Sequence, residues 1–250
     1  MRVLIIGDSC EDVYVYGRVD RLAPEAPVPV FVRTDEKRNG GMALNVYNNL
    51  QSLGVDCDII HNEEDIEKIR YVHHQTNHIL MRVDSDESKI KRIEKKFLTK
   101  KYLTQYDAVV ISDYDKGFLS DSDIEKICYY HPLTFMDTKK DLGRWAEDCK
   151  WIKINQVEYE KTKDKIENRM YLYDESLVVT LGSEGCRYKD IIYPVKKVEI
   201  KDLAGAGDTF LAGLVSKYLE TEDISQALKF ANECATIVVQ QKGVNVVKKP

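Results

Sequence analysis

The chain has 250 residues, of which 43% are hydrophobic and 32% are charged, and its formal net charge is −5 at pH 7. This size and composition fit one α/β domain with a small appendage. The acidic balance argues against a general nucleic-acid binder. No apolar run reaches the roughly 18 residues that a membrane span needs.

Six cysteines are scattered along the chain without a C-x-x-C pair. This spacing favours reduced, mostly buried thiols over disulfides or a zinc site. The N-terminal apolar run is too short for a signal peptide, because it meets Asp8 at once. We therefore expect a cytoplasmic protein with no membrane partner and no nucleic-acid partner.

The first predicted strand covers residues 3–6, an apolar run that stops at Gly7 and Asp8. Ligands of open α/β sheets lie beyond the carboxyl ends of strands. Asp8 and Asp12 are therefore candidates for holding the hydroxyls of a polyol. Ordinary turn chemistry explains Asp8 equally well.

Short strands interrupted by prolines follow, at 14–19 and 30–33. Because proline confines strands to edges or irregular positions, residues 13–38 predict a small β-appendage that is a lid, a dimer contact, or both. Paired strands within 71–84 are a candidate second part of it. A helix is predicted to open at Asn39-Gly40-Gly41 and to end at Gly54.

Residues 86–103 predict an amphipathic helix with Ile90, Ile93 and Phe97 on one face. Beyond it, strands at 108–112, 134–136, 151–154 and 177–180 alternate with helices at 121–130, 142–149 and 156–165. A last helix is predicted at 225–241. This alternation implies a doubly wound, mostly parallel sheet with helices on both faces. Polar residues follow the predicted strand ends: Asp8, Asp113 with Lys116, Asp137 with Lys139, Asn155 with Glu158, Thr180, and Asp208.

Residues 202–208 read D-L-A-G-A-G-D. The alternating segment at 198–200 predicts a strand that leads into this turn, and the apolar spacing from Phe210 predicts a helix after it. Gly205, Ala206 and Gly207 lack bulk where the helix begins, so their N–H groups can approach an anion. The carboxylate of Asp208 then suits a base that takes a proton while the amides hold the transferring group. Taken alone, an Asp in the first turn is also explained by the helix dipole.

Four segments, in this order, resemble the ribokinase (PfkB-like) family of sugar kinases nearly end to end. They are Gly40-Gly41 with Asn45, the pair Asn155-x-x-Glu158, residues 180–185 (T-L-G-S-E-G), and the D-x-x-G-A-G-D of residues 202–208. Residues 21–30, 80–84, 112–117 and 137–139 are also similar to the heptose 7-phosphate kinases within this family. The resemblance implies a ribokinase-like α/β fold, with residues 1–250 as one kinase domain carrying the β-lid.

The implied reaction moves the γ-phosphoryl group of ATP, with Mg²⁺, to O1 of D-glycero-D-manno-heptose 7-phosphate. By the same resemblance, Asp208 would be the base, and the Gly205, Ala206 and Gly207 amides would stabilise phosphoryl charge. The sugar hydroxyls would be held by Asp8, Asp12, Gly40, Gly41 and Asn45. The substrate phosphate would be faced by Arg82, Lys116 and Lys139.

The nucleotide would be surrounded by Thr180, Gly182, Gly185 and Asn232, with its phosphates organised by Asn155 and Glu158. Glu158 would reach Mg²⁺ through water, and Asp202 would help to bind a monovalent cation such as K⁺. Ala204 stands where the heptose kinase pattern has Thr, which weakens the expectation of a cation. The 62–69 region is shorter than in relatives.

The expected partners are a sugar phosphate, ATP, a second copy of the chain bound through the β-lid, and a separate nucleotidyltransferase for the next step. Two alternatives stay open from the sequence. One is a kinase for another sugar or sugar phosphate, because pocket preference depends on contacts that spacing does not reveal. The other is a catalytically weakened homologue that only binds sugar or nucleotide.

Overall fold

The computed structural model describes residues 1–166 and 172–248. Within these ranges the larger sheet has the strand order β12-β11-β10-β9-β8-β7-β1-β4. Its parallel strands are β4 (Asp56–His61), β1 (Arg2–Gly7), β7 (Ala108–Asp113), β8 (Thr134–Thr138), β9 (Trp151–Asn155) and β10 (Leu177–Thr180). The antiparallel β11 (Cys186–Tyr188) and β12 (Ile191–Tyr193) extend one edge. The predicted mostly parallel α/β sheet is confirmed.

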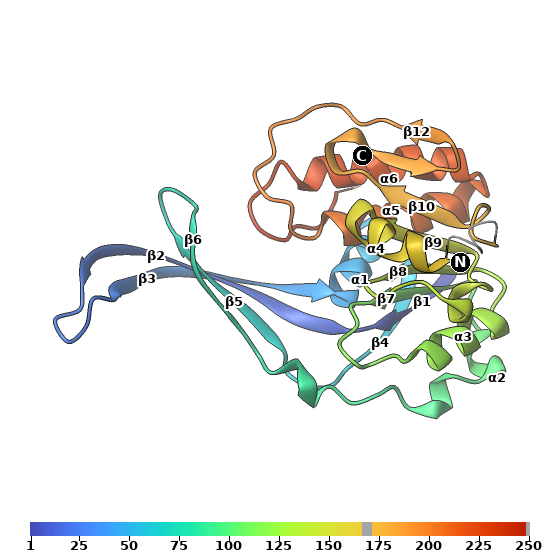
Figure 1. The fold of residues 1–250 in the computed structure, drawn as a ribbon, viewed down its shortest axis with the longest axis horizontal. Coiled ribbons are helices and arrows are strands. Elements are labelled where there is room, and N and C mark those ends of the chain that lie inside the picture. Colours follow the sequence, from blue (N-terminus) through green and yellow to red (C-terminus); the bar gives the residue numbers. More distant parts are fainter. Residues whose placement is uncertain (167–171, 249–250) are drawn as a thin grey trace.

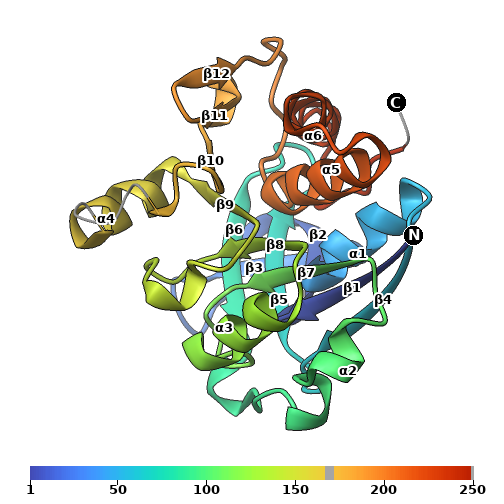
Figure 2. The ribbon, with the colours of Figure 1, turned by 90° about the vertical axis from the view of Figure 1, so that its right-hand side faces the viewer.

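Helices cover both faces of this sheet, because alternate residues of each buried strand point to opposite sides. Ile5 of β1 lies in one core cluster with Leu50 of α1 (Ala43–Ser52) and Leu214 of α5 (Ala206–Thr221), which α6 (Ile224–Val238) joins. Ile6 lies in the opposite cluster with Ile127 of α3 (Asp121–Tyr130). Figure 2 shows α5 and α6 on one side of the sheet and α3 on the other.

A second sheet of four strands projects from the body (Figure 1), in the order β3-β2-β5-β6. It consists of β2 (Ser9–Leu22), β3 (Pro29–Met42), β5 (Glu67–His73) and β6 (Ile79–Asp84). The expectation of short, proline-broken strands is wrong here, because β2 and β3 each run for 14 residues. Pro24 and Pro27 fall in the connection between them, and Pro29 only begins β3, so no proline interrupts a strand.

The predicted helix at 86–103 is also wrong. This segment contains 3₁₀ turns at Glu87–Lys89 and Lys95–Phe97 and a short α2 (Lys100–Leu103). Its apolar residues still reach the core, since Ile93 and Leu98 are buried. The Ile93 N–H bonds to the Phe118 carbonyl at 3.0 Å, so a tertiary contact holds the backbone where a helix would have bonded within itself.

Three further boundaries differ from the prediction. Only Arg144–Ala146 is helical between 142 and 149, and residues 198–200 form no strand. The helix expected from residue 39 begins at Ala43, because residues 39–42 complete β3. α4 (Gln156–Ile166) follows β9 as expected.

No helix in the described ranges is long and apolar enough to cross a membrane. All six cysteines are free and buried.

Candidate active site

The candidate site lies where the carboxyl ends of β1, β7, β8 and β9 meet the N-terminus of α5. Asp113 and Asn155 end their strands, and Asp8 directly follows β1. The side chains of this sheet edge contact residues of α5 and α1, as the contacts below show. Such an edge is where open α/β sheets bind ligands.

Asp208 is the buried acid of the site, with 4% of its surface exposed. One carboxylate oxygen accepts a hydrogen bond from the Tyr114 hydroxyl at 2.7 Å, and the other accepts from the Asn45 amide at 2.9 Å. Burial raises the pKa of Asp208 to about 6, although both hydrogen bonds lower it. The group is therefore mostly ionised at pH 7 yet more basic than an exposed Asp, which suits a general base.

We expect Tyr114→Phe to move the acid limb of the kcat/KM–pH profile to higher pH. The lost hydrogen bond lowers the Asp208 pKa in the native protein, so its removal raises that pKa further above its ordinary value. Activity should then fall more at pH 6 than at pH 8. Tyr129→Phe, at a side chain that is 73% exposed, is the matched control. An unmoved or lowered acid limb would contradict this role of Tyr114.

The predicted anion hole opens on Gly205, the N-cap of α5, whose φ of 78° favours glycine. A Cβ there would also lie 2.6 Å from the Asn45 amide nitrogen. The Ala206 N–H donates to the Leu203 carbonyl oxygen at 3.2 Å, so this predicted donor already has an acceptor within the protein. In the described part of the chain no acceptor pairs with the N–H of Gly205 or Gly207, and these two remain for a ligand.

A charged cluster lies beside this helix end. Lys153 pairs with Asp137 at 2.6 Å, and Lys139 pairs with Glu158 at 2.6 Å. The Asn155 N–H bonds to one Glu158 oxygen at 2.7 Å, and the Glu158 N–H bonds to the Asn155 side chain at 2.9 Å. These reciprocal bonds fix the predicted phosphate- and magnesium-organising pair at the start of α4. Lys139 therefore faces this pair rather than the small sheet.

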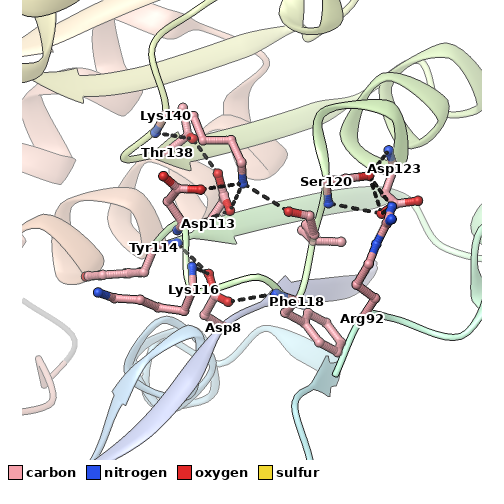
Figure 3. A network of polar contacts seen from close by, with 12 residues as sticks. Asp8, Arg92, Asp113, Tyr114, Lys116, Phe118, Ser120, Asp123, Thr138 and Lys140 are labelled. Atoms are coloured by element: carbon pink, nitrogen blue, oxygen red, sulfur yellow. Dashed lines mark hydrogen bonds and ion pairs between the residues drawn. The ribbon is translucent and has the colours of Figure 1, made fainter. Parts of the chain in front are cut away.

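Asp8 has different partners from those that were expected. It is fully buried, and its oxygens accept the N–H groups of Tyr114 (2.7 Å), Phe118 (3.3 Å) and Lys116 (3.4 Å), as Figure 3 shows for the first two. Asp8 thus shapes the loop that places the Tyr114 hydroxyl on Asp208. The Lys116 ammonium pairs with Glu87 at 2.6 Å, so this predicted phosphate contact is already paired.

The small sheet supplies the other wall. Asp12 of β2 is buried and pairs with Arg70 of β5 at 2.5 Å. A side chain at Gly41 would meet Asp12 at 2.3 Å and the Cys10 sulfur at 2.8 Å, so this position has room for no side chain. Gly40 lies in β3, and a side chain there would meet Leu44 instead.

Arg82 of β6 lies directly across from Arg70 in the β5–β6 pairing, and it pairs with Asp84 at 2.7 Å. The pKa of the Cys10 thiol is raised to about 12, first by burial and then by Asp12, and the charges of Asp208 and Arg70 also act on it. The Cys10 thiol is therefore close enough to Asp208 and to Arg70 of the small sheet for both charges to act on it.

A cavity of 150 Å³ lies on the other side of Gly207. Its lining includes the four residues predicted around the nucleotide, which are Thr180, Gly182, Gly185 and Asn232. Apolar side chains such as Val198 and Val239 complete a surface that suits a purine base. Gly185 has a φ of 97°, and a Cβ there would lie 2.0 Å from the Tyr193 carbonyl oxygen, so only glycine fits.

The Asp202 carboxylate accepts hydrogen bonds from backbone N–H groups. Its oxygens accept the N–H groups of Ala204 at 2.9 Å and Gly243 at 3.0 Å, which ties the C-terminal loop to the glycine turn. No group of three or more His, Cys, Asp or Glu within residues 1–166 and 172–248 could hold a metal. A cation here would depend on backbone carbonyl oxygens.

Sequence reasoning missed Tyr114, Lys153 and Arg70 as site residues. Lys153 carried a usable signal, because it is one cation inside an otherwise apolar buried strand. Tyr114 and Arg70 carried none, since each acts through a partner 94 or 58 residues away in the chain.

Comparison with known proteins adds independent findings. The family model described as "pfkB family carbohydrate kinase" matches residues 48–249. "Bifunctional protein HldE" of Helicobacter pylori (strain Shi470) is 30% identical, over 97% of this chain and 63% of that protein. The chain thus spans less than two thirds of the length of this curated relative. The HldE protein of a Nitratiruptor species is 29% identical, over 97% of this chain and 62% of that protein.

Solved structures share the fold. Thermotoga maritima ribokinase superposes with a TM-score of 0.73 at 12% identity, covering 97% of this chain and 94% of that one. Escherichia coli phosphofructokinase-2 in complex with potassium superposes with a TM-score of 0.71 at 13% identity, covering 99% and 96%. Because the family model matches most of its length, the chain belongs to the pfkB family of carbohydrate kinases, phosphotransferases that use ATP and act on a sugar hydroxyl.

Proposed function

We propose that this kinase phosphorylates a sugar phosphate, with O1 of D-glycero-D-manno-heptose 7-phosphate as its acceptor. The observation that carries the proposal is the position of Asp208. This base lies in the first turn of α5, next to the free N–H groups of Gly205 and Gly207. The charges of Asp208 and of Arg70 on the small sheet both act on the Cys10 thiol. The similarity to HldE proteins over 97% of the chain supports the heptose class of substrate.

In the proposed reaction Asp208 takes the proton of the sugar hydroxyl as the oxygen attacks the γ-phosphorus of ATP. The Gly205 and Gly207 N–H groups stabilise the charge that spreads over the phosphoryl oxygens. Asn155 and Glu158 fit a magnesium ion held through water and nucleotide phosphates, because both present oxygen atoms on a fixed turn. Such an ion would neutralise phosphate charge.

The substrate phosphate is proposed to bind Arg70 and Arg82. Arg82 keeps its predicted role, and Arg70 replaces Lys116 and Lys139, whose ammonium groups the structure pairs with Glu87 and Glu158. Arginine suits this role because its planar fork binds a phosphate with two hydrogen bonds, and its five N–H donors outnumber those that one carboxylate partner uses. Asp12, which orients Arg70, is left with its second oxygen toward Gly41 and the sugar.

The part of the four-stranded small sheet that was predicted as the lid, residues 13–38 together with 71–84, is proposed to act as a lid and to join two copies of the chain. Alternation along β6 turns Arg82 toward the site and Met81 and Val83 outward, where they are 53% and 43% exposed. Light scattering should give the mass of a dimer for the native chain and of a monomer for Met81→Glu. Ile192→Glu, at a residue that is 54% exposed on β12, is the control. A monomeric native chain would refute the dimer.

A monovalent cation is proposed near Asp202, held by carbonyl oxygens of the glycine turn and the loop around Gly243. The similar phosphofructokinase-2 was solved in complex with potassium, which supports this. Replacing Na⁺ by K⁺ at constant ionic strength should raise the kcat of the native protein. Equal rates in both salts would count against the cation.

The substrate proposal is tested with a panel of sugars and sugar phosphates in the presence of ATP and Mg²⁺. We expect ADP release to be fastest with heptose 7-phosphate, and phosphorus NMR to show the new phosphate at O1. A phosphate at another position, or a faster hexose or ketose phosphate, would redirect the proposal to another sugar. Tight sugar binding without turnover on any member would favour a weakened homologue.

The product is proposed to be the substrate of a nucleotidyltransferase active site that these 250 residues do not form. The 250-residue chain with ATP and heptose 7-phosphate should then release a bisphosphate and no nucleotide sugar. Formation of a nucleotide sugar by this chain alone would contradict the proposal.

A further inference from the structure

Lys153 is a buried cation in the middle of β9, with 3% of its side chain exposed. Its ammonium lies 2.6 Å from Asp137, whose side chain is equally buried. The attraction within such a pair often fails to offset the cost of removing both charges from water. Stability alone is therefore a weak reason for an ion pair in this strand.

The ammonium lies directly against the N-terminus of α5. A Cβ at Gly207 would lie 2.9 Å from the Lys153 nitrogen and 3.8 Å from an Asp137 oxygen, and no other atom of the described residues outside its own helix turn would lie within 4 Å. Gly207 does not have the left-handed φ that favours glycine. What its missing side chain provides is room between the free N–H groups and the ammonium.

A cation at a helix N-terminus is unfavourable unless an anion is present, because the helix dipole is positive there. Asp137 supplies one negative charge, and its other oxygen is buried without a hydrogen-bond partner, with Lys139 3.7 Å away. The Lys153 ammonium has three N–H donors, and among the described residues only Asp137 accepts from it. The remaining donors can therefore bind an anion.

We propose that Lys153 is a catalytic residue that shares its ammonium between Asp137 and the transferring phosphoryl group, and that Asp137 is the positioning residue that holds it. The inference rests on the proposed phosphoryl transfer. In that step the sugar oxygen–phosphorus bond forms while the bond to the ADP oxygen breaks, and ADP keeps the electron pair. The sugar proton goes to Asp208, and Lys153 donates to a non-bridging phosphoryl oxygen throughout.

The test compares Asp137→Asn with the double variant Asp137→Asn/Lys153→Met. If Lys153 acts on the phosphoryl group, the double variant should have a kcat about 30-fold below that of Asp137→Asn, as expected for one lost hydrogen bond to a charged group. A purely structural pair gives the opposite order. Asp137→Asn then leaves a buried cation unpaired and is the worse variant, whereas the double variant keeps a neutral core and folds.

Nucleotide binding gives a second readout that does not depend on turnover. In Lys153→Met, or in the double variant if the single one does not fold, calorimetry should show a larger loss of affinity for ATP than for ADP. Equal losses for both nucleotides would overturn the proposal. If the native chain binds ATP but phosphorylates no sugar, the proposed function is refuted. The relative losses of affinity for ATP and ADP would still test whether Lys153 contacts the γ-phosphate.

The pH profile separates the two residues as well. The polar and charged groups that interact with Asp208 include Tyr114, Asn45, Asp137, Lys153, Lys139 and Cys10. Among them Lys153 lowers the pKa of Asp208 and Asp137 raises it. The acid limb of kcat/KM should therefore move up in Lys153→Met and down in Asp137→Asn. Shifts in the same direction would contradict the assignment.

Discussion

Asp208→Asn is expected to lower kcat by about 10³-fold while leaving the affinity for ATP unchanged. A general base contributes roughly 10²- to 10⁴-fold, and an amide cannot accept the sugar proton. The substitution should not disturb the fold. The carbonyl of the new side chain can accept from Asn45, and its NH₂ can donate to the Tyr114 oxygen, so both of the partners found for Asp208 stay satisfied.

The measurement pairs initial rates of ADP release with calorimetric ATP binding. Glu222→Gln is the matched control, because Glu222 is the C-cap residue at the far end of the same helix, where its backbone N–H, not its carboxylate, bonds to the Tyr218 carbonyl. It should keep the native kcat. An Asp208→Asn protein within about tenfold of native activity would show that proton removal is not the role of this residue.

Beyond residue 107 the parallel strands β7 to β10 and the helices α3 to α6 were predictable, because each of these strands is a short, mostly apolar run. The strands β11 and β12 and the 3₁₀ turn at Arg144–Ala146 were not predicted. The 86–103 segment was not predicted correctly either. Its Ile90, Ile93 and Phe97 repeat at helical spacing, but the Ile93 N–H finds its acceptor in the loop at Phe118. A hydrogen bond between residues so far apart in the sequence cannot be predicted from the local spacing of apolar residues.

The turn at residues 202–208 likewise has features that the local sequence predicted and contacts that it did not. The glycines and Asp208 could be predicted because their chemistry depends on neighbours in sequence. Asn45 was assigned from the family resemblance. Tyr114 could not be identified, because its position depends on the long-range hydrogen bond between its N–H and Asp8. Charged residues at strand ends were predicted as a group, yet which of them face a ligand depended on partners such as Glu87.

Arg70→Met is expected to lower kcat/KM for the sugar phosphate by at least about a hundredfold, while the KM for ATP stays near its native value. Removing one member of a buried, hydrogen-bonded charge pair costs about 2–5 kcal/mol. Here the guanidinium, with 13% of its side chain exposed, is proposed to bind the phosphate while Asp12 holds it. Arg70→Lys keeps the charge but loses the fork, so its loss should be intermediate.

The unphosphorylated sugar separates this binding role from a structural one. Arg70→Met should reduce the preference for the phosphorylated over the unphosphorylated acceptor, because only the former contacts the guanidinium. Arg18→Met is the control, since Arg18 forms an exposed pair with Asp20 elsewhere on β2. Equal losses for both acceptors would mean that Arg70 merely supports Asp12, and the phosphate-binding role of this face of the small sheet would then be refuted.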